Sequence, residues 1–98
     1  MDKRATALAW FTEQMRAKLE LRRDHGDNWE EMGVEWLWER MAQEALTELL
    51  PAWHCLNPCW ANVIDECADV SNFCLMLADT ARQIAEAEAM ATEEGARE

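Results

Sequence analysis

Four carboxylate residues are spaced so that they can meet across two neighbouring helices. Glu44 and Glu48 lie one helical turn apart, and so do Glu66 and Asp69. Carboxylate oxygens, without imidazole or thiolate, suit Mg²⁺ or Mn²⁺ better than zinc. A site of this kind can polarise a phosphoryl oxygen and, with a second ion, lower the pKa of an attacking water. The spacing therefore predicts metal-dependent hydrolysis of a phosphoanhydride.

The second carboxylate pair interrupts an apolar stretch between residues 63 and 79. At ~100° per residue, one face of a helix collects five apolar residues, namely Val63, Cys67, Val70, Cys74 and Leu77. Glu66 and Phe73 fall at the edge of this face, with Asp69 beside them. Burying a carboxylate costs free energy unless a cation, an ion-pair partner or water compensates. We interpret the compensating group as a metal ion.

Apolar residues recur at intervals of three or four along most of the chain, which predicts an all-α protein. The predicted helices cover residues 3–23, 29–50 and 58 to 79 or 80. Residues 81–91 form a fourth helix or continue the third, and residues 92–98 are expected to fray. No run shows the strict alternation of a half-buried strand. The expected fold is a four-helix bundle in a single domain, residues 1–98.

The connections between these helices carry clear start and stop signals. Gly26 can close the first helix and Asn28 can cap the second. Pro51 is expected to end the second helix, and Asn57-Pro58 is expected to start the third. Short connections favour antiparallel neighbours. The first carboxylate pair should then face the second.

Length and composition predict an oligomer. A chain of 98 residues buries only a modest part of its surface, yet half of its residues are hydrophobic and six are Trp. We expect a core shared between protomers, in a homodimer or a dimer of dimers.

The net charge of −11 argues against nucleic acid as a partner, because such a surface repels phosphate backbones. No apolar stretch approaches the ~18 residues that a membrane span needs, and no secretory signal pattern is visible. We expect a cytoplasmic protein without membrane contacts.

The two carboxylate segments resemble a known family signature. Residues Glu44 to Leu49 and Glu66 to Phe73 resemble the EExxE and ExxD motifs of the MazG-like all-α nucleoside triphosphate pyrophosphohydrolases. The likeness is greatest to the short, single-domain members from phages and mobile elements, and it covers residues 18–79.

The resemblance implies an activity, a cofactor and a set of ligands. Glu44, Glu48, Glu66 and Asp69 would be the catalytic residues and would hold Mg²⁺, with Mn²⁺ as a substitute. Water would attack the α-phosphorus of a nucleoside or deoxynucleoside triphosphate, giving a nucleoside monophosphate and pyrophosphate. The expected role is housecleaning of the nucleotide pool.

One residue departs from the family pattern. The second consecutive glutamate of EExxE is replaced by Ala45, so one carboxylate ligand or general base is missing. Glu13, or a carboxylate of another protomer, is a candidate substitute. The alternative function is a catalytically degenerate helical scaffold or interaction protein. A third alternative is a module that binds partners through exposed Trp residues.

Five further residues are candidates for binding the substrate. Phe73 lies one turn beyond the second carboxylate pair and could stack on the base. Trp29 matches a position where related enzymes place an aromatic residue against the base, but it could equally staple the loop to the core. Resemblance places Asn72 near the sugar or the metal, and otherwise it is simply exposed. Lys18 and Arg82 could meet the phosphate charge, and each could instead be a solvated surface residue.

The cysteines do not require a zinc site or disulfides. Cys67 and Cys74 lie on the apolar helix face and are expected to be buried free thiols. His54, Cys55 and Cys59 offer three ligands without a fourth nearby, in a spacing unlike a zinc knuckle. We therefore do not expect zinc.

Overall fold

The computed structural model describes residues 2–21 and 28–97, and every regular element in this part of the chain is helical. The elements are α1 (Lys3–Leu21), the 3₁₀ turn η2 (Trp29–Met32), α2 (Val34–Glu44), the π-helical segment η3 (Ala45–Leu49), α3 (Leu50–His54) and α4 (Trp60–Arg97). The all-α prediction is confirmed. The expected end of the first helix at residue 23, and the closing role of Gly26, lie outside the described residues.

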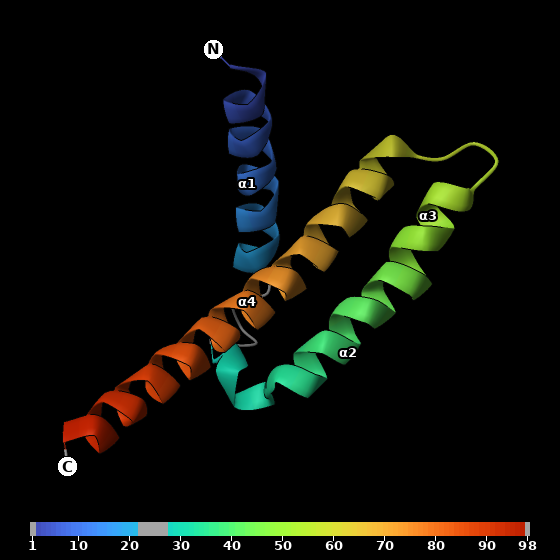
Figure 1. Cartoon of the computed structure of the whole chain (residues 1–98). Coiled ribbons are helices and arrows are strands. Elements are labelled where there is room, and N and C mark those ends of the chain that lie inside the picture. Colours follow the sequence, from blue (N-terminus) through green and yellow to red (C-terminus); the bar gives the residue numbers. More distant parts are fainter. Residues whose placement is uncertain (1, 22–27, 98) are drawn as a thin grey trace.

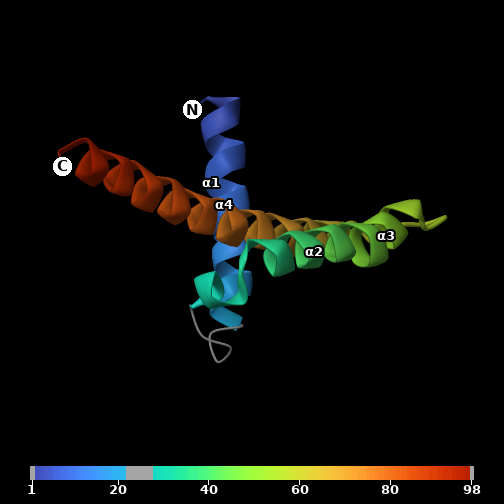
Figure 2. The same ribbon diagram turned by 60° about the horizontal axis from the view of Figure 1, so that its bottom comes forward.

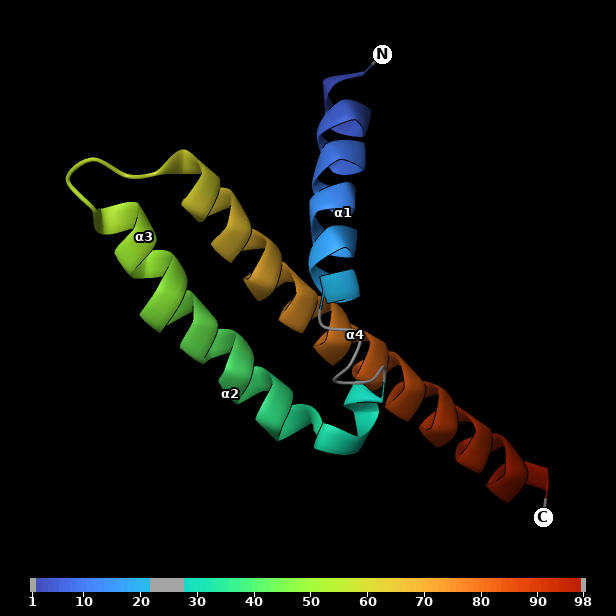
Figure 3. The same ribbon diagram turned by 180° about the vertical axis from the view of Figure 1, so that it is seen from behind.

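The central unit is an antiparallel hairpin. α2, η3 and α3 form one rod, and this rod lies alongside α4 (Figures 1 and 3). The predicted antiparallel pairing of these segments is confirmed. α1 instead packs across α4 at a steep angle (Figure 2). Within the described residues, the expected packing of the first helix against the second is therefore wrong.

The second predicted helix is broken near its start by Gly33. This residue has a φ of 87°, a conformation that glycine adopts without steric cost. It separates η2 from α2, and its carbonyl accepts the backbone hydrogen bond of Leu37 at 3.1 Å. The α-helix thus begins at Val34 and not at Trp29.

Pro51 does not end the helix as predicted, because the rod continues to His54. A proline within a helix lacks the N–H group and crowds the carbonyl four residues earlier, here that of Thr47. The rod widens into η3 just before this point, where the N–H of Leu50 donates to the carbonyl of Ala45. Pro51 then occupies the first turn of α3, where a missing N–H is tolerated.

α4 is a single helix of 38 residues. It begins at Trp60, two residues after the predicted Pro58, and the carbonyl of Cys59 accepts hydrogen bonds from Asn62 and Val63. The predicted fourth helix is its continuation, since the alanine- and glutamate-rich sequence contains no helix breaker before Gly95. α4 remains helical through Arg97, into the segment that was expected to fray. Residues 81–96 are exposed and project past the other helices (Figure 1).

The buried face of α4 differs from the predicted apolar face. Its buried residues are Ala68, Asp69, Asn72, Phe73 and Thr80. Val63, Cys67, Val70 and Leu77 are only half-buried, and Cys74 is exposed. α1 and the α2 rod both pack against α4, and Ala68 is its least exposed residue. The prediction that Cys74 is buried is wrong for the single chain, although Cys67 and Cys74 are both free thiols as expected.

The chain is extended for its length. Its radius of gyration is 17.2 Å, against about 13 Å for a compact domain of 100 residues. The buried apolar residues of the described chain are few, namely Leu37, Ala52, Ala68 and Phe73. Within the same residues, no helix combines the length and the hydrophobicity that crossing a membrane requires.

Candidate metal centre

Three of the four predicted metal ligands converge between the hairpin helices. Glu44 is the last residue of α2, and Glu66 and Asp69 lie one turn apart on α4. One carboxylate oxygen from each lies within 4.8 Å of the others. We refer to Glu44, Glu66 and Asp69 as the carboxylate cluster. Among the described residues, it is the only group of three or more acidic, histidine or cysteine side chains that could hold a metal ion.

Glu48 lies outside the carboxylate cluster, and its residue is exposed. It belongs to η3, where the wider turn changes the rotation between residues four apart. Its charge still reaches the cluster, because Glu48 contributes to raising the pKa of Glu66. Ala45 follows Glu44 directly and is half-buried, so this position adds no carboxylate.

Glu66 is the least compensated member of the carboxylate cluster. Burial raises the pKa of Glu66, and the charges of Asp69, Glu48 and then Asp65 and Glu44 raise it further. Glu66 has no ion-pair partner within the described part of the chain. A cation placed between the three carboxylates would remove this repulsion.

Lys18 reaches the cluster from α1. Its ammonium Nζ lies 2.9 Å from Asp65 Oδ1 and 3.3 Å from Asp69 Oδ2. The Lys18 side chain is only 18% exposed, and that of Asp69 is 7% exposed. Burial by itself lowers the pKa of Lys18, but the hydrogen bond to Asp65 and the charge of Asp69 outweigh it, so the pKa is raised. Sequence reasoning selected Lys18 but missed Asp65.

Arg40 was also missed by the sequence analysis. It donates to Glu44 Oε1 from Nη2 at 2.8 Å, across one turn of α2. Its guanidinium lies over the ring of Phe73, 5.2 Å from the centroid. The spacing of four between Arg40 and Glu44 was the signal that could have revealed this contact.

Phe73 is buried next to the cluster, at 7% exposure. Arg40 covers one part of its ring, and Trp36 meets it edge-on with ring centroids 6.4 Å apart. Arg40 therefore occupies part of the ring surface that a stacked base would need. The predicted stacking role of Phe73 remains a prediction.

Asn72 joins α4 to α1. Its Nδ2 donates to the backbone carbonyl of Met15 at 3.1 Å, and the residue is 5% exposed. Its side-chain oxygen Oδ1 is buried without a hydrogen-bond partner. The alternative that Asn72 is simply an exposed residue is therefore wrong. Its Oδ1 is an unsatisfied buried polar atom on α4, the helix that also carries Glu66 and Asp69.

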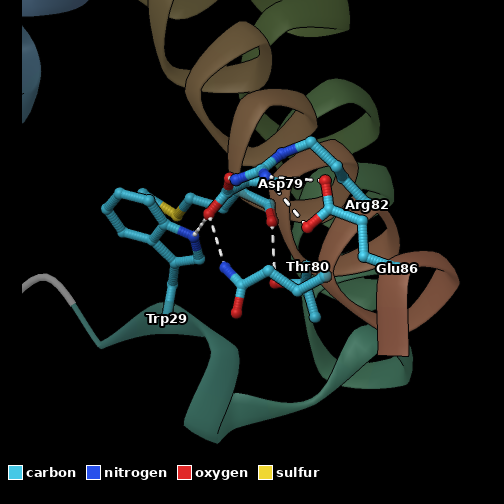
Figure 4. Close-up of polar contacts among 7 residues, drawn as sticks. Trp29, Asp79, Thr80, Arg82 and Glu86 are labelled. Carbon is cyan, nitrogen blue, oxygen red and sulfur yellow. Dashed lines mark hydrogen bonds and ion pairs between the residues drawn. The ribbon is translucent and has the colours of Figure 1, made fainter. Parts of the chain in front are cut away.

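Trp29 and Arg82 belong to a different polar network (Figure 4). The indole N–H of Trp29 donates to Asp79 Oδ2 at 3.2 Å, and Arg82 Nη2 donates to Asp79 Oδ1 at 2.6 Å. Arg82 also pairs with Glu86 at 3.2 Å. Asp79 lies ten residues beyond Asp69 on α4, or ~15 Å along the helix axis. The structure therefore does not bring Trp29 and Arg82 to the carboxylate cluster.

The donor set fits a hard divalent cation. Carboxylate oxygens are the ligands that Mg²⁺ prefers, at ~2.1 Å, so that opposite ligands lie ~4.2 Å apart. The cluster oxygens would need only a small inward movement from their separation of up to 4.8 Å. His54, Cys55 and Cys59 are all exposed and form no such group. Glu44, Glu66 and Asp69 are the residues that could hold the ion.

Comparison with known proteins adds no further constraint: no protein-family model, no curated protein and no solved structure matches the chain.

Proposed function

We propose that the protein is a MazG-like, Mg²⁺-dependent nucleoside triphosphate pyrophosphohydrolase. The observation that carries the proposal is the carboxylate cluster, in which Glu44 of one helix meets Glu66 and Asp69 of the antiparallel helix. The residues that make this cluster are those that resemble the EExxE and ExxD motifs. The reaction is hydrolysis of a nucleoside or deoxynucleoside triphosphate to the monophosphate and pyrophosphate.

The residues of the cluster have separate tasks in this proposal. Asp69 and Glu44 are buried or half-buried and held by Lys18 and Arg40 respectively, which fixes their carboxylates between the helices. Glu66 has no such partner in the described chain and is the carboxylate most in need of a cation. Bound Mg²⁺ would neutralise phosphate oxygens and make a water more acidic. Glu48 lies outside the cluster, and its charge adds to the repulsion on Glu66.

The apolar surface supports a core completed by a second copy of the chain. Several large side chains are exposed, among them Trp38, Trp53 and Trp60 at 57–59%. Together with the extended shape, this surface is more than a stable monomer of this size usually leaves uncovered. We propose a MazG-like bundle whose core is shared in a homodimer or a dimer of dimers. Light scattering coupled to gel filtration measures the assembly, and a monomer at micromolar concentration would contradict this part of the proposal.

The activity is tested with a panel of the canonical nucleoside and deoxynucleoside triphosphates, including dUTP and dCTP, in Mg²⁺. Pyrophosphate and nucleoside monophosphate are expected in equal amounts. Glu66→Ala and Asp69→Ala should each abolish release, whereas Glu88→Ala, on the exposed end of α4, should not. If the folded protein releases no pyrophosphate from any substrate, the proposal fails.

A catalytically degenerate scaffold is the second candidate, and Ala45 is the observation that favours it. At this position the chain lacks the carboxylate that the motif of the family supplies. The two candidates differ in their response to ligands. A catalytic site should gain thermal stability with Mg²⁺ plus a nonhydrolysable triphosphate, because both bind only the folded state. A scaffold without the site should show no change in Tm.

A further inference from the structure

Within the described residues, two cationic side chains already neutralise part of the carboxylate cluster. Arg40 pairs with Glu44 at 2.8 Å, and Lys18 pairs with Asp69 at 3.3 Å and with Asp65 at 2.9 Å. Of the three cluster members, this leaves Glu66 without a cationic partner in the described chain. The protein thus compensates all but one of these carboxylates with its own side chains.

We propose that the Lys18 ammonium is a fixed cation of the metal centre, which takes the place of a second divalent ion and limits the centre to one ion per chain. This inference rests on the proposed metal-dependent function. It assigns to Lys18 a role beside the metal instead of the predicted direct role in phosphate binding.

The position of Lys18 supports this role. Two divalent ions that act together lie ~3.5–4 Å apart and share bridging carboxylates. Asp69 is the cluster member that Lys18 contacts, and Asp65 contacts the same ammonium. A second ion between Asp65 and Asp69 would therefore occupy the place of the ammonium and be repelled by it.

The burial of Lys18 and the presence of Ala45 in the motif also support a centre with a single divalent ion. The Lys18 side chain is 18% exposed, which keeps its charge close to the cluster and poorly screened by solvent. Ala45 removes one carboxylate from the motif, and a centre with fewer anionic ligands and with built-in cations holds fewer divalent ions.

The test is the number of Mn²⁺ ions bound per chain, measured by native mass spectrometry and by isothermal titration. Wild type is compared with Lys18→Met, Lys18→Arg and Lys3→Met, and Glu66→Ala gives the baseline for ions bound elsewhere on the acidic surface. Lys3 is the other lysine of the chain and is exposed at the start of α1, so its replacement matches the change of charge without touching the cluster. Pyrophosphate release is followed in the same samples.

One ion above baseline is expected for wild type, Lys18→Arg and Lys3→Met, and two are expected for Lys18→Met. Two ions in wild type, or one in Lys18→Met, overturn the inference. If Lys18→Met is unfolded without metal, Mn²⁺ is titrated while circular dichroism follows refolding. Two ions per refolded chain are then expected, and failure to refold counts against the inference.

The same experiment separates the inference from the proposed function. One ion per wild-type chain without hydrolysis of any triphosphate would contradict the proposed function but agree with the role of Lys18. Two ions per wild-type chain together with hydrolysis would agree with the proposed function but contradict the role of Lys18. No ion above the Glu66→Ala baseline in any variant would contradict both.

Discussion

The guanidinium of Arg40 lies over the ring of Phe73 while its Nη2 pairs with Glu44, so one side chain links the carboxylate cluster to the aromatic residue beside it. Both contacts come from elements of the hairpin, α2 and α4. Arg40 is 31% exposed, and its partner Glu44 is 12% exposed. Arg40 therefore contacts the carboxylate cluster through Glu44 and also covers part of the Phe73 ring.

Replacement of Arg40 by alanine should destabilise the fold modestly. A cation–π contact at a partly exposed site contributes ~0.5–1 kcal/mol, and an ion pair four residues apart on a helix contributes ~0.3–0.5 kcal/mol. We expect a loss of about 1 kcal/mol in the free energy of unfolding, measured in urea. Arg16→Ala, which breaks exposed pairs on α1, is the control and should change stability by less than ~0.5 kcal/mol. An equal loss in both variants would contradict the assigned contact.

Replacement of Glu66 by glutamine should stabilise the metal-free protein at neutral pH. The raised pKa of Glu66 means that its ionised form is disfavoured in the folded state. The free energy of unfolding therefore falls as pH rises from 4.5, the ordinary pKa of a glutamate, through the higher pKa of Glu66 in the folded protein. The variant should lose this pH dependence and also lose any gain in Tm from Mg²⁺. Thermal unfolding from pH 4 to 8, with and without Mg²⁺, measures both, and a lower Tm without metal at pH 8 would contradict the prediction.

Replacement of Asn72 by alanine should loosen α1 from α4. The part-buried hydrogen bond to the Met15 carbonyl is lost, at a cost of ~0.5–1.5 kcal/mol, while that carbonyl remains an acceptor within α1. The cost should fall at the lower end, because the unpaired Oδ1 of Asn72 is removed as well. Hydrogen exchange along α1 should accelerate more than exchange along α2. Asn62→Ala, on the exposed side of the first turns of α4, serves as the control and should leave both rates unchanged.

Replacement of Asp79 by asparagine should remove a pH-dependent contribution at acid pH. The hydrogen bond from Arg82, together with that from Trp29, holds the pKa of Asp79 below its ordinary value of 3.8. A carboxyl group whose pKa is lowered by folding stabilises the protein fully at pH values above its pKa in the unfolded chain. This contribution is lost as pH falls through its lower pKa in the folded protein. The difference in Tm between wild type and variant should be constant above about pH 5 and shrink below pH 4. Glu88→Gln is the matched control, and a difference that grows toward acid pH would refute the assignment.

The sequence by itself determined the helical class, the pairing of the second and third predicted helices and three of the residues that meet between them. Those features follow from local periodicity and from short connections, which constrain neighbours along the chain whatever else the fold does. The positions of Glu44, Glu66 and Asp69 were predictable because turns of two adjacent antiparallel helices must lie opposite each other.

Only the tertiary structure decided the rest, because the deciding contacts join residues far apart in the chain. Lys18 meets Asp65 and Asp69 only because α1 crosses α4, and no periodicity within α1 encodes that crossing. The rod continues past Pro51, which lies in the first turn of α3 directly after the wider turn of η3. The buried face of α4 contains Asp69 and not Cys74. Packing against α1 and the α2 rod determines which side of α4 is covered, and the hydrophobic pattern of α4 alone does not.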